Sequence, residues 1–221
     1  GAAAVSPSAA ILRGLAPDGG LYVPAEFPSF SLAEIAALGK MSYEQRALTV
    51  LERFLPDFTR EELTGAIRGA YGTGFDCGEI APIRKVGGWA HALELWHGPT
   101  LAFKDMALQL LPHLLTLSAG KNGEQREIFI LVATSGDTGK AALEGFLDVS
   151  GTRCCVFYPR EGVSQAQKLQ MVTTGGRETS SSSLSSTFSA ESASSAVLSS
   201  FISSVTPNSE ATRDAVSKSS S

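Results

Sequence analysis

The sequence has 221 residues, of which 43% are hydrophobic and 18% charged, and its net charge is −4. This is enough chain for one or two globular domains, and the absence of a basic cluster argues against a nucleic-acid partner. No apolar run reaches the roughly 20 residues of a membrane-spanning helix, and no secretory signal is visible. The odd number of cysteines, three, favours a reducing, cytoplasmic setting.

The first third of the chain is predicted to be helical. A turn is expected at 16–20, where proline, aspartate and two glycines follow one another. Three helix starts then carry the capping-box pattern, in which a serine or threonine and an acidic or amide side chain three residues later satisfy each other's backbone N–H groups. These pairs are Ser31 with Glu34, Ser42 with Gln45, and Thr59 with Glu62. Leucines at helical spacing follow, so residues 1–80 are expected to form a small N-terminal helical region.

Strands and helices alternate over residues 81–176, the predicted α/β region. The expected elements are a half-buried strand over 89–95, a helix over 104–118 that stops at Gly120, a strand over 128–133 buried on both faces, a helix to about 149, a strand over 156–158 and a helix over 164–172. This alternation predicts an α/β fold, a parallel sheet with helices on both faces. Such sheets bind ligands beyond the carboxyl ends of their strands, so the loops at 96–103 and 134–139 are the candidate site.

The first candidate is the glycine-containing loop that follows the strand over 128–133. Ser135, Gly136, Asp137, Thr138 and Gly139 would bring backbone N–H groups close to an anion at a helix N-terminus. The alternative is a simple strand-to-helix turn in which Asp137 or Thr138 caps the helix. A nucleotide-binding P-loop is excluded, because that motif needs glycine at 134 and serine or threonine at 141, where this chain has threonine and alanine.

The second candidate is Lys104, which follows an apolar and aromatic stretch and opens a predicted helix. A cation at a helix N-terminus is repelled by the positive end of the helix dipole. This repulsion and the apolar surroundings both favour the neutral lysine amine, which is the nucleophile that can form a Schiff base with a carbonyl cofactor. The alternative is an exposed lysine whose neighbour Asp105 offsets the dipole. The three histidines show no metal-ligand spacing, so no metal site is expected.

Several long motifs resemble threonine synthases, which are pyridoxal-phosphate enzymes of the tryptophan-synthase β-like fold. The most specific one, ELWHGPTLAFKDMA at 94–107, is similar to the segment that attaches the cofactor. The others are LAPDGGLYVP at 15–24, ATSGDTGKAA at 133–142, and the stretch from 158 to 171. The resemblance runs from residue 11 to 175 and implies that the chain covers about the first half of such an enzyme.

By this resemblance the fold would be a three-layer, fold-type II sheet, and the reaction would convert O-phosphohomoserine and water to threonine and phosphate, the last step of threonine biosynthesis. Lys104 would carry pyridoxal 5'-phosphate as a Schiff base and act as the catalytic base, with Phe103 packed against the cofactor. Residues 135–139 would bind the substrate carboxylate, in a monomer or homodimer. Two alternatives stay open: a related phospho-lyase acting on the same substrate, and an inactive truncated fragment.

The end of the chain differs sharply in composition from the rest. Of 28 serines, 19 lie in residues 177–221. Serine-rich tracts are typical of flexible linkers, although apolar residues recur at spacings compatible with a helix from about 189 to 204. Residues 177–221 are therefore predicted to be a separate segment, either a linker or a stretch whose sequence is poorly determined.

Overall fold

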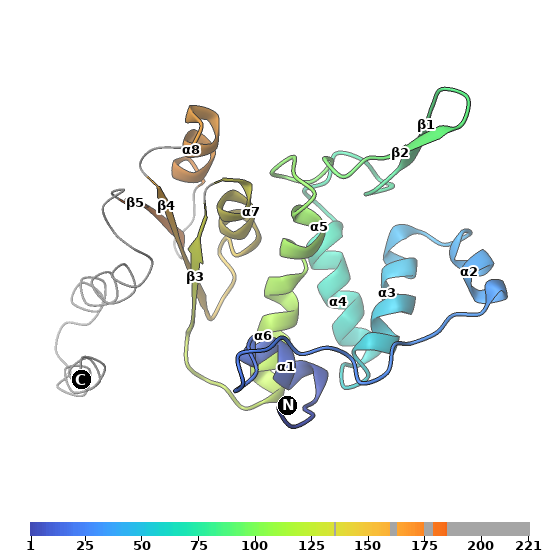
Figure 1. The fold of residues 1–221 in the computed structure, drawn as a ribbon, viewed down its shortest axis with the longest axis horizontal. Coiled ribbons are helices and arrows are strands. Elements are labelled where there is room, and N and C mark those ends of the chain that lie inside the picture. The colour runs from blue at the N-terminus through green and yellow to red at the C-terminus, as the bar shows by residue number, and fades with distance from the viewer. Residues whose placement is uncertain (135, 160–162, 175–178, 185–221) are drawn as a thin grey trace.

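The computed structural model describes residues 1–134, 136–159 and 163–174, and the backbone of residues 179–184. The helices are α1 (Pro7–Arg13), α2 (Leu32–Leu38), α3 (Tyr43–Phe54), α4 (Arg60–Tyr71), α5 (Asp105–Leu108), α6 (Leu111–Lys121), α7 (Asp137–Gly145) and α8 (Gln165–Val172). The strands are β1 (Ile83–Val86), β2 (Ala90–Leu93), β3 (Ile128–Ala133), β4 (Thr152–Pro159) and β5 (Thr179–Leu184). Helices α5 and α6 lie between the N-terminal helices and the sheet (Figure 1).

The predicted N-terminal helices begin where the capping boxes place them. Helices α2, α3 and α4 follow directly after Ser31, Ser42 and Thr59, and in each box both reciprocal hydrogen bonds are present. Helices α3 and α4 then pack with α6 around Leu63 and Ile67, which are completely buried. This packing supplies the helical core, whereas α2 has no buried residue.

Helix α1 is not predicted by these patterns, although the turn over 16–20 that follows it is confirmed by a hydrogen bond from Gly19 N–H to the Ala16 carbonyl. Ser6 caps α1 through its hydroxyl, and Pro7 occupies the first turn. The third helical position is Ala9, which cannot complete a capping box, so the start lacks the signal that marks the other helices.

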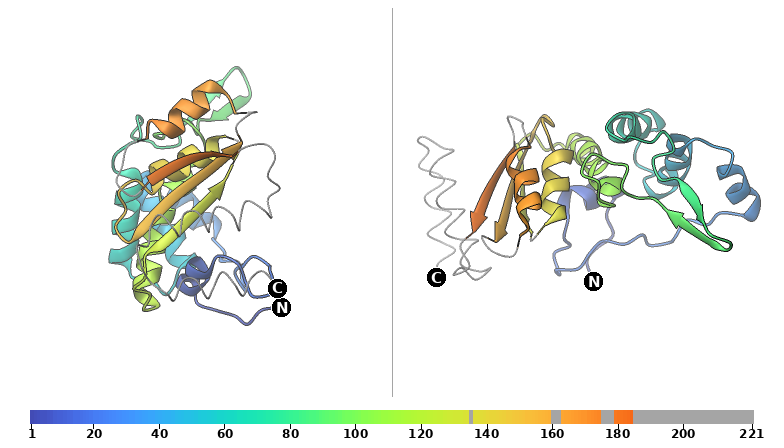
Figure 2. Two further views of the ribbon diagram at one scale, coloured as in Figure 1. Left: turned by 90° about the vertical axis from the view of Figure 1, so that its left-hand side faces the viewer. Right: turned by 90° about the horizontal axis from the view of Figure 1, so that it is seen from above.

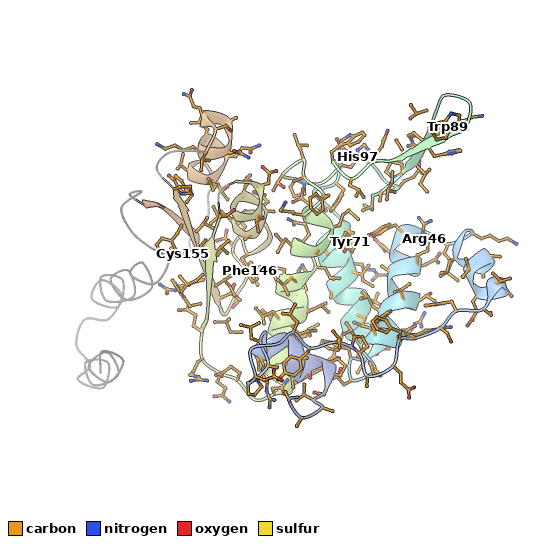
Figure 3. The ribbon with its side chains drawn as sticks, in the orientation of Figure 1. Arg46, Tyr71, Trp89, His97, Phe146 and Cys155 are labelled. Carbon is orange, nitrogen blue, oxygen red and sulfur yellow. The ribbon has the colours of Figure 1, made fainter. Side chains whose placement is uncertain are left out.

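The strand expected over 89–95 is one arm of a short hairpin, in which β1 and β2 pair antiparallel. The alternation expected of a half-buried strand is present over Ala90–Leu93, where Ala90 and Ala92 are half-buried and His91 and Leu93 are exposed. The side chain of Trp89 is 91% exposed. Figure 3 shows Trp89 near the tip of the hairpin, away from the body of the molecule. The alanines therefore form the more buried face of this strand, and its larger side chains are exposed.

The single helix expected over 104–118 is divided into α5 and α6. Pro112 stands in the first turn of α6. Its nitrogen carries no hydrogen and could not donate to the Leu108 carbonyl, so an uninterrupted helix is disfavoured there. The break lets α6 run on to Lys121 along the N-terminal helices, one residue beyond the predicted stop at Gly120.

Strands β3, β4 and β5 form a parallel sheet in that order. The hydrophobic core on one face joins the inward side chains of β3 and β4 to α6, α7 and α8, with Phe146, Val156 and Met171 almost completely buried. Cys154 and Cys155 are buried residues of β4, which begins four residues before the strand predicted over 156–158. The described residues therefore form a mixed α/β chain built on a parallel sheet.

The prediction of helices on both faces is not met by the described residues. Figure 2 shows the sheet in front of the helices in its left view. The burial of β3 alternates, with Ile130 and Val132 inward and Leu131 50% exposed, so the prediction that this strand is buried on both faces is wrong. The reason is the strand order. Since β4 lies beside β3 and β5 lies on the far side of β4, two right-handed crossovers place α7 and α8 on the same face of the sheet. A second helical layer stays a prediction.

The serine-rich end of the chain contributes a strand to this sheet. Residues 179–184 form β5 and pair in parallel with β4, so part of the segment 177–221 continues the α/β region. The helix expected over 189–204 lies outside the described residues, and the domain limits at 80 and 176 stay predictions.

Candidate functional site

The two candidate loops lie at the same end of the molecule. One leads from β2 into α5 and carries Lys104, and the other leads from β3 into α7. Helices α5 and α7 lie side by side and both begin at the upper end of the molecule in Figure 1. They pack closely because Gly145 of α7 has no side chain, and a Cβ there would overlap the Leu108 carbonyl oxygen. The two loops therefore lie at the same end of the molecule through the packing of α5 on α7, and not as neighbours on one parallel sheet, because β2 belongs to the separate antiparallel hairpin.

The buried carboxylate of Asp105 fixes the loop that precedes Lys104. This side chain is fully buried and accepts hydrogen bonds from the Thr100 backbone N–H at 2.8 Å and the Thr100 hydroxyl at 2.7 Å. A Cβ on Gly98 would lie 2.5 Å from the Asp105 Oδ2 atom, so only glycine fits there. Leu101 has a φ of 60°, in the left-handed region. Asp105 thus fixes a tight turn immediately before the lysine, instead of merely offsetting the helix dipole.

The amine of Lys104 faces the neighbouring aromatic ring. Its Nζ atom lies 4.3 Å from the centre of the Phe103 ring, and the Phe103 side chain is 61% exposed. Within the described ranges no carboxylate pairs with this amine, whereas Lys121 and Lys140 both form ion pairs. Lys104 occupies the N-cap position of α5 and has no side-chain cap. The arrangement presents an available amine beside an accessible aromatic face.

His97 connects the start of this loop to the segment after α4 and to Glu94, which lies three residues earlier in the chain. Its Nδ1 atom lies 2.5 Å from Asp76 Oδ1 and its Nε2 atom 2.9 Å from Glu94 Oε2. Since each ring nitrogen faces a carboxylate oxygen, both must donate, which requires the protonated imidazolium. Glu94 and Asp76 accordingly raise the His97 pKa above its ordinary value. Figure 3 shows His97 between the hairpin and the helices, so its role here is to anchor the loop.

The glycine-containing loop is not capped as the alternative predicted. Gly136 is the N-cap of α7, and neither Asp137 nor Thr138 makes a side-chain cap. Thr134 Oγ1 accepts a hydrogen bond from Gly136 N–H at 3.2 Å, which folds the loop. The first N–H groups of a helix have no partner inside it, and the described residues provide no acceptor for those of Asp137 and Thr138. Ser135 lies outside the described residues.

Gly139 lets α7 lie directly on the sheet. A Cβ at this position would be 2.6 Å from Val156 Cγ1, closer still to Thr134 Cγ2, and 3.2 Å from Met171 Sδ. Only a glycine allows the helix to start at this distance from β4 and α8. The packing therefore determines where the loop's backbone N–H groups point.

Two contacts join α7 to α8 and the residues that follow α8, and the sequence patterns miss both. Gln167 Nε2 of α8 donates to Asp137 Oδ1 at 2.9 Å, and Lys140 Nζ of α7 donates to Thr174 Oγ1 at 3.0 Å. Lys140 Nζ also donates to Glu144 within α7 at 2.9 Å. The pair Ser164 and Gln167 is itself a capping box that the sequence displays. The contact across to Asp137 depends on tertiary packing and has no local signal.

Other kinds of site receive no support from the described residues. No three histidine, cysteine or acidic side chains in the described ranges gather as metal ligands would. None of the helices described combines the length and apolar character needed to cross a membrane.

Comparison with known proteins identifies similar sequences. Residues 1–71 match the family model described as "Threonine synthase N terminus". The human protein "Threonine synthase-like 1" is 43% identical over 173 residues, which are 75% of this chain and 23% of that protein. "Threonine synthase" of Pseudomonas aeruginosa is 42% identical over 164 residues, which are 74% of this chain and 34% of the relative.

Solved structures agree with these sequence matches. A crystal structure of PLP-bound threonine synthase from Brucella melitensis superposes with a TM-score of 0.76 at 38% identity, over 81% of this chain and 38% of that one. The matched residues make up between about a quarter and two fifths of the length of these relatives. About three quarters of the chain is thus similar to part of proteins named threonine synthase, and its first 71 residues match the model for the N terminus of that family.

Proposed function

We propose that the protein is a threonine synthase that uses pyridoxal 5'-phosphate to convert O-phosphohomoserine and water to threonine and phosphate. The observation that carries this proposal is the position of Lys104, an amine with no carboxylate partner among the described residues, at the end of the molecule where the β3–α7 loop also lies. The Brucella melitensis relative, described as PLP-bound, supports the choice of cofactor.

The residues around Lys104 suit this cofactor. A Schiff-base lysine needs an amine that is accessible and not held by a carboxylate. Lys104 meets that requirement, and the exposed ring of Phe103 offers an apolar surface against which a planar pyridine can pack. When bound, pyridoxal phosphate draws electrons from the α-carbon of an attached amino acid. Lys104 would hold the group, with Phe103 beside it.

Lys104 would also act as the general base. Once released, its Nζ atom would accept the α-proton of the substrate and afterwards move a proton near Cβ. The hydrogen bonds from Thr100 to Asp105 support this role by fixing the backbone turn from which the lysine side chain extends.

The β3–α7 loop is the proposed binding site for the substrate carboxylate. We assign this role to Ser135, Gly136, Asp137, Thr138 and Gly139. The N–H groups of Asp137 and Thr138 point from the start of α7, where the helix dipole favours an anion. Hydroxyl groups from the loop would complete the contacts.

The remaining features of the proposal follow from the family. The whole enzyme would have the three-layer, fold-type II sheet, act as a carbon–oxygen lyase at the last step of threonine biosynthesis, and be a monomer or homodimer without a nucleic-acid partner. A cytoplasmic location is proposed because the sequence has three cysteines, an odd number that does not suit a disulfide framework.

The test uses the full-length protein that contains this sequence. Borohydride reduction in the presence of pyridoxal phosphate should add the reduced cofactor to the peptide that contains Lys104. Lys104→Ala should lose this adduct and all threonine formation. Lys85→Ala, at an exposed lysine of the hairpin, should retain both. An adduct with 2-oxobutanoate as the product would identify the alternative phospho-lyase, and a full-length protein that forms neither adduct nor product would refute both.

A further inference from the structure

The side-chain amide of Gln167 is fixed in orientation by the start of its own helix. Gln167 is the third residue of α8, and its Oε1 atom accepts a hydrogen bond from Ser164 N–H at 3.2 Å. The Ser164 hydroxyl in return accepts from Gln167 N–H at 3.2 Å. Because the amide oxygen is committed to a backbone donor, the amide nitrogen must point the other way.

That nitrogen faces the β3–α7 loop. It donates to Asp137 Oδ1 at 2.9 Å, and a Cβ on Gly136 would lie 2.7 Å from it. The amide of Gln167 therefore lies directly over the N-cap residue of α7. Residues separated by 30 positions in the sequence are connected by this one contact, at the place where α7 and α8 pack together.

The contact matters because Asp137 carries a negative charge at the first position of α7. A carboxylate there is attracted to the unpaired N–H groups of the first helical turn. In the structure it makes no such cap and bonds to Gln167 instead. If the carboxylate turned onto its own helix, it would occupy the donors that the proposed function gives to the substrate.

We propose that Gln167 is a positioning residue for the substrate loop. Its side-chain amide holds the Asp137 carboxylate away from the N-terminus of α7. The N–H groups of the loop therefore stay available to the substrate carboxylate. This inference rests on the proposed function. Gln167 acts through Asp137 and the backbone, and it is a neutral donor that adds no charge next to an anionic ligand.

Gln167→Glu is the informative variant. Glutamate serves as well as glutamine in a capping box, so the start of α8 is kept. The substitution replaces the donor that faces Asp137 with a negatively charged acceptor, so it breaks the contact across the two helices and repels the Asp137 carboxylate. Gln170→Glu is the matched control, because it adds the same charge on the same helix at an exposed side chain.

Hydrogen–deuterium exchange of the full-length protein, without substrate, tests the contact directly. Loss of a hydrogen bond to a charged group should speed exchange about tenfold at the hydrogen-bonded amides of Gly136 and Gly139 in Gln167→Glu. Exchange in 165–172 should not change, and Gln170→Glu should match the wild type. Equal loop exchange in Gln167→Glu and wild type would overturn the inference, whether or not the protein makes threonine.

Steady-state kinetics tests the consequence for the substrate. For Gln167→Glu, KM for O-phosphohomoserine should rise about tenfold with kcat within about twofold, because a ground-state contact is weakened. A fall in kcat at unchanged KM would refute the assigned role. A wild-type protein that forms no threonine would refute the proposed function, while the exchange measurement would still decide whether Gln167 orders the loop.

Discussion

Replacing Gly139 with alanine should destabilise the protein and displace the loop before α7. The new Cβ would lie 2.6 Å from Val156 Cγ1 and nearer still to Thr134 Cγ2. Both neighbours are β-branched, so their χ1 angles are stiff and their methyl groups cannot easily rotate away. Overpacking of this kind costs about 1–3 kcal/mol. With the cost near the upper end, and about 1 kcal/mol regained from the better helix propensity of alanine, we expect a net loss of about 2 kcal/mol.

Gly65→Ala is the matched control, because Gly65 lies in the middle of α4 and no atom lies within 4 Å of its added Cβ. It should gain about 1 kcal/mol. Urea unfolding followed by circular dichroism gives both values from the shift in midpoint at constant m-value. The two variants should differ by about 3 kcal/mol and have opposite signs. If Gly139→Ala were as stabilising as Gly65→Ala, the close approach of α7 to the sheet would be refuted.

Three further predictions concern the core, a cap and the histidine anchor. Phe146 is only 1% exposed, so Phe146→Ala should lower the free energy of unfolding by about 3–5 kcal/mol. Phe27 is 75% exposed, so the control Phe27→Ala should change this free energy by about 0.5 kcal/mol or less. Equal urea midpoints for the two variants would contradict this prediction. Ser42→Ala should cost about 1 kcal/mol by the same assay, since it removes one arm of the α3 capping box. The pKa of His97 is raised above 6.5 in the folded state, so its stabilisation should be complete below pH 6.5 and lost as the pH rises through the folded-state pKa. His97→Asn should lack that decline when unfolding is measured across this range, and an identical slope in both proteins would argue against the anchor.

The sequence predicts features that depend on neighbouring residues. The capping boxes at Ser31, Ser42 and Thr59 start helices as predicted, because their energetics involve only four consecutive residues. Lys104 at a helix start and the break after the strand over 128–133 are equally local. The resemblance to threonine synthases adds roles to these positions that spacing alone leaves open.

The sequence patterns miss features that depend on residues far apart in the sequence. The alternation over 89–95 correctly indicates a half-buried strand, but it does not tell which face is buried, and the structure buries Ala90 and Ala92 more than His91 and Leu93. The one-sided sheet depends on strand order, which no periodicity encodes. Asp105 shows the same limit: nothing in its immediate sequence indicates that it is fully buried and bonded to Thr100.

The order of the strands also has a consequence for how the chain folds. Ile128 pairs with Thr152 and Cys154 with Thr179, offsets of 24 and 25 residues. Each strand joins the one that precedes it in the chain, so the sheet can grow outward in two nearly equal steps. Closing each loop carries a similar entropic cost. Among the described strands of this sheet, every pairing therefore spans about 25 residues of chain, so the sheet has a lower contact order than one whose neighbouring strands are distant in sequence.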